Sequence, residues 1–167
     1  MGMLEGHPLG SVLELGCGSG FYSKRLNDRK CSRLVCVDFS AAMLNNLDIP
    51  GVEKIEADIQ NFRSEEKFDT IICAGAAEFL QKQDGLFFNV ASMLNRGGFF
   101  LILVPTLSFS GQMYRLFHQI HGVAVKLFTL NEINEFAKAA GLVITHRQRV
   151  SLFSLVVGFR LKSEMVK

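Results

Sequence analysis

Three glycines lie two residues apart directly after a short apolar run. Gly16, Gly18 and Gly20 follow the predicted strand Ser11–Leu15 and open a helix predicted over residues 20–28. Glycine has no Cβ and tolerates positive φ, so a loop built from it can turn sharply and let a ligand approach the backbone. We interpret the segment as a ligand-binding loop; the alternative is a strand-to-helix turn that happens to be rich in glycine.

An acidic residue stands about 20 positions beyond this loop. Asp38 follows the predicted strand Arg33–Val37, where a carboxylate accepts hydrogen bonds from both hydroxyls of a ribose and repels a 2′-phosphate. Phe39 is placed to lie against an adenine ring. The glycine spacing is neither G-x-G-x-x-G nor a P-loop with Lys-Ser/Thr, so an unphosphorylated nucleoside fits best. The alternative for Asp38 is a strand-end or helix-capping carboxylate.

The elements that must position these residues alternate between strand and helix. Because strands alternating with helices form right-handed βαβ units, we expect an α/β fold with a mostly parallel seven-stranded sheet and helices on both faces. The last two strands should form an antiparallel hairpin, and the final one, apolar on both faces, should lie inside the sheet. The predicted strands are 11–15, 33–37, 52–57, 68–73, 99–104, 142–150 and 152–161; helices are predicted over 20–28, 40–47, 84–95 and 129–140. We expect residues 95–98 to cap the third helix at its C-terminus.

Composition narrows the class of protein. The 167 residues are 49% hydrophobic and carry a net charge of +2. This composition predicts one globular domain over residues 1–167 and argues against a disordered chain. The small net charge argues against binding to nucleic acid. No apolar run is long enough to span a membrane, and the first residues do not resemble a secretory signal. Four cysteines without CxxC spacing favour a reduced, cytoplasmic protein, and no metal site is predicted.

Six segments in order resemble the motifs of class I S-adenosylmethionine (SAM)-dependent methyltransferases. They are VLELGCGSGFY, VDFSAAML, IEADIQNF, FDTIICAGAAEFL, LNRGGFFLILVP and FTLNEINEFAKAAGLVI. The resemblance covers nearly the whole chain and is nearest to small-molecule methyltransferases of the ubiquinone and menaquinone biosynthesis type. It implies a Rossmann-like fold, SAM as methyl donor with S-adenosylhomocysteine (SAH) as product, and a small acceptor.

The resemblance also implies a set of cofactor contacts. Asp38 would hold the ribose, Phe39 and Met43 would flank adenine, and Asp58 would face its amino group beside Ile59. The methionine half would lie against Glu14, Gly16, Cys17, Gly18 and Gly20 of the loop, with Ala74 near the methionyl amine. A solvated loop carboxylate is the alternative for Asp58.

Two departures from the family pattern bear on catalysis. Many relatives carry Glu-His after the fourth strand, whereas this chain has Glu78-Phe79, so a base from that position is in doubt. The chain begins almost at its first strand, whereas relatives often have an additional N-terminal segment that closes over the substrate. No D/N-P-P-Y follows the fourth strand and no Pro-Cys nucleophile occurs, which argues against methylation of DNA bases.

Residues 106–128 form an insertion that the alternating sheet does not need. Within it, Phe109, Met113, Leu116, Phe117 and Ile120 repeat at helical spacing and form one apolar stripe. We interpret the segment as a possible lid over the substrate; the alternative is a helix packed on the core. With 15 phenylalanines in the chain, an apolar or aromatic acceptor is plausible. His118 and His121 are candidate bases and Arg115 a candidate carboxylate anchor, although a surface position is the more common role for each of these residues.

The leading hypothesis is therefore a methyltransferase acting on a small, apolar or aromatic molecule. A non-catalytic SAM-fold domain with a binding or regulatory role is the main alternative, because of Phe79 and the early start of the chain. A nicotinamide-dependent oxidoreductase is a weaker alternative, since the glycine spacing is unsuitable. The acceptor, the attacking atom and the oligomeric state stay open.

Overall fold

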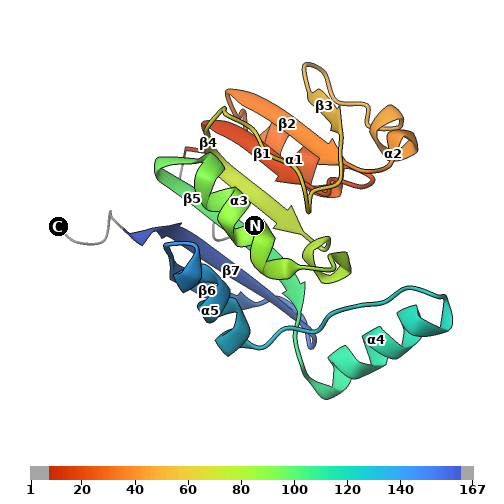
Figure 1. The fold of residues 1–167 in the computed structure, drawn as a ribbon. Coiled ribbons are helices and arrows are strands. Elements are labelled where there is room, and N and C mark those ends of the chain that lie inside the picture. Colours follow the sequence, from red (N-terminus) through yellow and green to blue (C-terminus); the bar gives the residue numbers. More distant parts are fainter. Residues whose placement is uncertain (1–7, 163–167) are drawn as a thin grey trace.

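A seven-stranded sheet forms the centre of the computed structural model, which describes residues 8–162 (Figure 1). Its order is β3-β2-β1-β4-β5-β7-β6, parallel except for β7, which runs antiparallel to both of its neighbours. The predicted α/β class, the seven strands and the interior position of the last strand are confirmed. The strands are β1 (Ser11–Leu15), β2 (Arg33–Asp38), β3 (Glu53–Glu56), β4 (Phe68–Ala74), β5 (Leu94–Pro105), β6 (Leu142–Arg149) and β7 (Ser154–Leu161).

Helices lie on both faces of the sheet. Helices α1 (Phe21–Asp28) and α2 (Ala41–Asn45) cover one face, where Leu26 and Leu44 pack on the β1 and β2 side chains. Helices α3 (Gln83–Met93) and α5 (Leu130–Ala139) cover the other face with Phe87, Ile133 and their neighbours. A short 3-10 helix, η2 (Ala77–Phe79), follows β4. Helix α4 (Phe109–Ile120) projects away from the sheet (Figure 1).

The junction between α3 and β5 differs from the prediction. The helix ends at Met93, and β5 starts at Leu94 rather than Phe99, because Leu94 already pairs with Phe68. The next pair is Thr70 with Phe99, so the extra residues of this irregularity lie in β5. Asn95 Nδ2 donates to Asp69 Oδ1 at 2.8 Å, which ties this early part of β5 to β4. Residues 95–98 therefore belong to an irregular strand, and the predicted helix cap at these residues is wrong. A strand pairing across the sheet overrode the local turn signal of Gly97 and Gly98.

Candidate functional site

A cavity of about 580 Å³ opens where β1, β2 and β4 end. This volume lies within the range of small-molecule binding sites, and the carboxyl ends of parallel strands are where open α/β sheets bind ligands. Its lining includes seven of the residues that the sequence predicts for the cofactor site: Gly16, Gly18, Asp38, Phe39, Met43, Asp58 and Ile59. The fold therefore brings residues from distant parts of the chain, such as Gly16 and Ile59, to the same cavity.

The glycine loop passes very close to the segment after β4. Gly16 has a φ of 74°, and a Cβ atom placed on it would lie 2.4 Å from the Cβ of Ala76. The backbone N–H groups of Gly16 and Cys17 both donate to the carbonyl of Val37, at 2.8 and 3.2 Å. Only glycine permits this conformation and this approach at position 16, so the loop forms the floor of the cavity between β2 and η2.

Asp38 is fixed by two backbone hydrogen bonds. Its Oδ2 accepts from the Gly18 N–H at 2.7 Å and its Oδ1 from the Ser40 N–H at 3.0 Å, and the residue is only 6% exposed. Each carboxylate oxygen has two lone pairs, so both oxygens retain acceptor capacity toward the cavity. The helix cap belongs to Ser40, whose Oγ accepts from the Met43 N–H at 3.3 Å. Asp38 therefore links the glycine loop to the end of β2 and is not the N-cap of α2.

The wall beyond Asp38 is mainly apolar. Phe39 and Met43 are largely exposed side chains that line the cavity, and Ile59 is buried at its edge. Asp58 also lines the cavity, and its Oδ1 accepts from the Gln60 N–H at 2.9 Å. This bond closes a turn, so the structure gives Asp58 a local role in addition to its place at the cavity.

Four predicted cofactor residues do not line this cavity. Glu14 lies buried below the loop, where its Oε2 accepts from Ser23 Oγ at 2.5 Å and burial raises the pKa of its carboxyl to about 7. Cys17 is buried as well, and the neighbouring Cys36 raises the pKa of its thiol. Gly20, with a φ of 78°, is the N-cap of α1. Glu14 thus belongs to β1, Cys17 to the loop and Gly20 to the start of α1, and none of the three lines the cavity.

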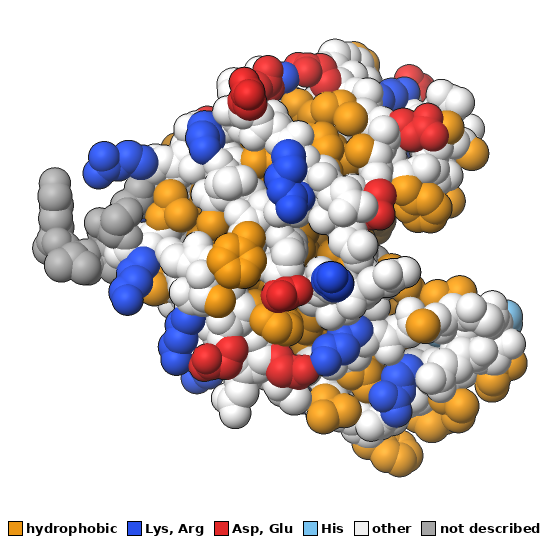
Figure 2. Space-filling model, in the orientation of Figure 1, with side chains coloured by type: hydrophobic (Ala, Val, Ile, Leu, Met, Phe, Trp, Pro, Cys, Tyr) orange, Lys and Arg blue, Asp and Glu red, His pale blue; other side chains and the backbone are white. Residues whose placement is uncertain are grey.

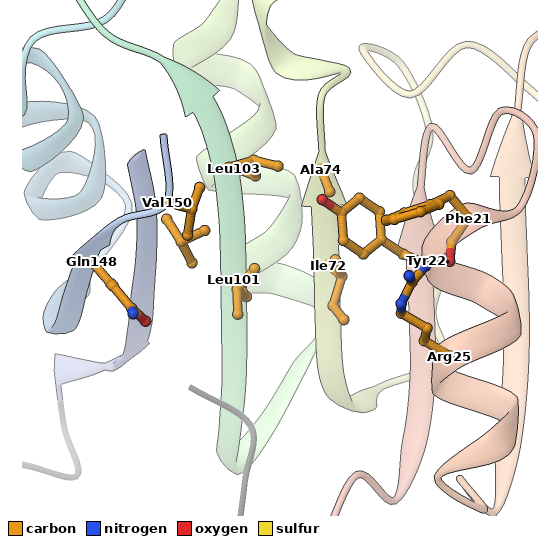
Figure 3. A pocket seen from close by; sticks show the side chains of 10 residues that line it. Phe21, Tyr22, Arg25, Ile72, Ala74, Leu101, Leu103, Gln148 and Val150 are labelled. Atoms are coloured by element: carbon orange, nitrogen blue, oxygen red, sulfur yellow. Dashed lines mark hydrogen bonds between the residues drawn. The ribbon is translucent and has the colours of Figure 1, made fainter. Parts of the chain in front are cut away.

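Ala74 lines a separate groove on the α1 side of the sheet (Figure 3). The groove encloses about 260 Å³ between α1 and the β6–β7 hairpin. Its floor is apolar and is formed by Ile72, Leu101 and Leu103, while Tyr22 and Arg25 extend over it from α1. Arg25 Nη1 donates to the Phe21 carbonyl at 3.0 Å, and its guanidinium lies 3.7 Å from the centre of the Phe21 ring. Because Ala74 precedes Gly75 of the cavity, the groove and the cavity adjoin at the end of β4.

Six lining residues were not predicted: Ser40, Gly75, Ala76, Phe79, Leu80 and Val123. A sequence signal existed for Gly75, because a glycine directly after an apolar strand often takes positive φ, here 72°. Val123 had no local signal. It reaches the cavity because the segment after α4 crosses η2, where the Lys126 N–H donates to the Glu78 carbonyl at 2.9 Å.

Glu78 is a buried carboxyl on η2. Its Oε2 has no hydrogen-bond partner among residues 8–162, and burial raises the pKa of the group to about 7. An unpaired buried carboxylate is costly, so the neutral form is favoured in the folded protein. The residue adjoins the cavity-lining Ala76 and Phe79, although it is not itself part of the lining.

The predicted lid, residues 106–128, contributes Val123 to the cavity lining, but no residue of helix α4 lines the cavity, and closure over an acceptor stays a prediction. The apolar stripe of α4 faces solvent, so the helix neither covers the cavity nor packs this face on the core. The opposite face makes the contacts: His118 lies against the Phe79 and Tyr114 rings, at centroid distances of 6.0 and 4.5 Å. His121 Nδ1 lies 2.8 Å from the Phe117 carbonyl. Neither candidate base lines the cavity, and Arg115 does not line it either.

Comparison with known proteins places this site in a family. A family model described as methyltransferase domain matches residues 13–102. A malonyl-[acyl-carrier protein] O-methyltransferase from Ilyobacter polytropus is 31% identical over 94 residues, which cover 53% of this chain and 35% of that protein. A trans-aconitate 2-methyltransferase from Escherichia coli is 32% identical over 97 residues, covering 56% and 38%. The matches thus span little more than a third of these relatives.

Solved structures share the fold at low sequence identity. A SAM-dependent methyltransferase from Mesorhizobium loti superposes with a TM-score of 0.79 at 17% identity, covering 92% of each chain. Magnesium protoporphyrin IX methyltransferase from Synechocystis, solved with bound SAH, superposes with a TM-score of 0.78 at 15% identity, covering 95% of this chain and 78% of that one.

The fold and the site therefore define the class of SAM-dependent methyltransferases with a Rossmann-like sheet. Because the family model matches more than half of its length, the chain belongs to the methyltransferase domain family, as its motifs predicted. S-adenosylmethionine is the cofactor of this class. Within residues 8–162, no helix has the length and apolar character needed to cross a bilayer, and no cluster of three or more His, Cys, Asp or Glu side chains is arranged to hold a metal ion.

Proposed function

We propose that this chain transfers a methyl group from SAM, bound in the cavity at the ends of β1, β2 and β4, to a small acceptor. The observation that carries the proposal is Asp38. Its carboxylate is held by the Gly18 N–H at the cavity wall, in a chain that belongs to the methyltransferase domain family. Two acceptor oxygens at a fixed position suit the vicinal hydroxyls of a ribose.

The remaining contacts fit the rest of the cofactor. Phe39 and Met43 offer an apolar wall to the adenine ring, with Ile59 beside it and the Asp58 carboxylate available to the amino group. The methionine half would follow the loop, which consists of Gly16, Cys17, Gly18 and Gly20 with Ser19, toward Ala74, with the buried Glu14 at the end of β1 behind it. The cavity of about 580 Å³ is large enough for a small-molecule ligand such as SAM. Its polar end at Asp38 suits a ribose, and its apolar end at Phe39, Met43 and Ile59 suits an adenine ring.

When bound, SAM supplies a methyl group that is already activated on a sulfonium. The protein's task is therefore to align the acceptor with the methyl group and to exclude water. We assign the acceptor to the groove of Figure 3, because it adjoins the cavity at Ala74. Its floor of Ile72, Leu101 and Leu103 favours an acceptor with an apolar or aromatic body.

We further propose that the acceptor is not a nucleic acid and that the protein works in the cytoplasm. The net charge of +2 is too close to neutral to argue for binding to a nucleic-acid duplex, and residues 74–79 lack the motif expected for base methylation. All four cysteines are free thiols, which suits a reducing compartment.

Calorimetric titration tests the cofactor assignment. We expect SAM and SAH to bind at 1:1 stoichiometry and NADH not to bind. Asp38→Ala should weaken SAM binding roughly 10- to 150-fold, the loss expected for hydrogen bonds to a charged group. Asp28→Ala, an exposed change at the end of α1, is the matched control and should bind as the wild type does. Unchanged SAM affinity in Asp38→Ala would refute the ribose assignment, and tight NADH binding without SAM binding would refute the proposed function.

A second candidate function is a non-catalytic domain that binds SAM. It is favoured by Phe79, which places a phenyl ring on the cavity wall where many relatives carry an imidazole, and by the position of His118 and His121 outside the lining. Conversion of SAM to SAH in the presence of cell-extract metabolites separates the two functions. SAH formation supports the enzyme, and stoichiometric binding without turnover supports the binding domain.

A further inference from the structure

Helix α4 presents its apolar face to solvent. Along this face Phe109 is 85% and Ile120 is 74% exposed. The space-filling view shows hydrophobic side chains gathered over the projecting helix (Figure 2). The residues of this face are Phe109, Met113, Leu116, Phe117 and Ile120, and each is at least half exposed. A contiguous apolar surface of this kind marks a site of interaction.

The tip of the β6–β7 hairpin extends the same surface. Ser110 Oγ donates to the Leu152 carbonyl at 2.9 Å, and the Tyr114 ring stacks on Phe153 at 5.0 Å, so helix and hairpin are held together. Leu152 is 78% exposed. Between α4 and the tip lies an open, almost wholly apolar hollow of about 650 Å³. We call the five α4 residues together with Leu152 the arm surface.

The segments that carry the arm surface contain no acidic residue. Neither residues 106–128 nor residues 142–162 include an aspartate or glutamate, although the chain has 16 of them. Arg147 and Arg149 are exposed on one face of β6 next to the tip. Neither arginine belongs to an ion pair among the described residues. The arm surface is therefore apolar with an uncompensated positive margin.

We propose that the arm surface docks this protein on an anionic lipid bilayer. An amphipathic helix with aromatic and aliphatic side chains on one face and cations beside it binds in the plane of the headgroups, with its apolar face among the acyl chains. Exposed arginines near such a surface add attraction to anionic lipids. This inference goes beyond the proposed methyl transfer and is independent of it.

Charge argues against a second copy of the chain as the occupant. A two-fold interface through the arm surface would bring the same patch of both subunits together, and with it Arg147 and Arg149 of each. Like charges facing one another across an interface oppose association. An anionic bilayer matches both features, because its acyl chains can contact the apolar side chains and its headgroups can attract the neighbouring arginines.

Docking by this surface would also place the cavity close to the membrane. His118, on the inner face of α4, lies against Phe79 of the cavity wall, and the segment that follows α4 brings Val123 to the same cavity. The cavity opening would thus be separated from the bilayer by the thickness of α4, roughly 10–12 Å.

Vesicle co-sedimentation tests the proposal. We expect the protein to bind vesicles of phosphatidylcholine mixed with phosphatidylglycerol, to bind pure phosphatidylcholine much more weakly, and to lose binding as salt is raised. Arg147→Gln with Arg149→Gln should lower the partition coefficient by about fivefold per arginine. Lys24→Gln with Arg63→Gln, two exposed cations remote from the arm surface, is the matched control and should bind nearly as the wild type does.

A pair of phenylalanine variants tests the apolar part. Phe109→Asp should abolish sedimentation with anionic vesicles, whereas Phe88→Asp, at a half-exposed phenylalanine on α3, should not. Both variants should bind SAM equally well, which shows that the fold is intact. Equal binding of wild type to neutral and anionic vesicles, no binding to either, or a dimer that Phe109→Asp disrupts would each overturn the proposal.

Discussion

Helices α4 and α5 follow one another in the chain and share the same design, yet their apolar faces have opposite surroundings. Each begins at a hydroxyl cap: Ser108 Oγ accepts from the Gly111 N–H at 3.1 Å, and Thr129 Oγ1 from the Glu132 N–H at 3.2 Å. Helix α5 buries Ile133 and Ala137 against the sheet, whereas α4 leaves its stripe in solvent. An amphipathic pattern thus predicts a helix with an apolar face, but it does not indicate whether that face packs on the protein core or remains free for a partner.

A matched pair of isoleucines gives the largest expected contrast. Ile133→Ala in α5 removes a fully buried side chain and should lower the free energy of unfolding by about 2–5 kcal/mol. Ile120→Ala in α4 removes a mostly exposed one and should change it by less than about 0.5 kcal/mol. Urea unfolding of both variants measures the difference. Equal losses would mean that α4 packs on the core in solution.

Glu78, beneath the segment that joins the two helices, should make stability depend on pH. Its pKa is raised from 4.5 to about 7 by burial, so the folded state holds a proton that the unfolded state has lost. This group's contribution is greatest below pH 4.5, declines as pH rises to about 7 and is then constant. Glu78→Gln should therefore stabilise the protein by up to about 3 kcal/mol at pH 8 relative to its effect at pH 4. Glu135→Gln, at an exposed site on α5, is the matched control for the substitution. A flat pH profile for Glu78→Gln would contradict the burial argument.

The start of α5 should show an intermediate effect. Thr129 and Glu132 form a capping box, in which Glu132 Oε2 also accepts from the Thr129 N–H at 2.9 Å. Thr129→Ala should cost about 1 kcal/mol by thermal unfolding, and Thr129→Ser, which keeps the hydroxyl, should recover most of it. If the alanine variant melts with the wild type, the cap does not anchor α5.

The smallest effect is expected at the centre of the α4 stripe. Phe117 is well exposed, so Phe117→Ala should leave stability within about 0.5 kcal/mol of the wild type and SAM affinity unchanged. If the free energy of unfolding falls by about 3–5 kcal/mol, as it does for a buried phenylalanine, the alternative that α4 packs on the protein core would be supported instead. Thermal melting and SAM titration on the same variant decide between them.

The fold and much of the cavity could be predicted because their signals are local. The alternation of apolar runs with helical patterns indicated the parallel sheet, and β7, apolar on both faces, was placed inside it correctly. The glycine loop and Asp38 were predicted to share a site from their separation of about 20 residues, and they do lie together because β1 and β2 are adjacent parallel strands. By contrast, Ala74 points into the groove rather than the cavity, and Glu14 lies beneath the loop, since the direction of a side chain depends on strand orientation and on the packing around it.

The sequence by itself determined the α/β class, the alternation of strands with helices, the sharp turn of the glycine loop and the family of the chain, because short-range periodicity and the freedom of glycine act within a few residues. The strand order was decided by the tertiary structure. Only the tertiary structure decided which residues meet at the cavity. Val123 lines it, and the His118 ring packs against Phe79 without reaching the lining. The tertiary structure also decided that Glu78 is buried with no hydrogen-bond partner for its Oε2 among the described residues. It also decided that the α4 stripe faces solvent. These contacts join segments far apart in the chain, and their geometry follows from how whole elements pack rather than from any local pattern.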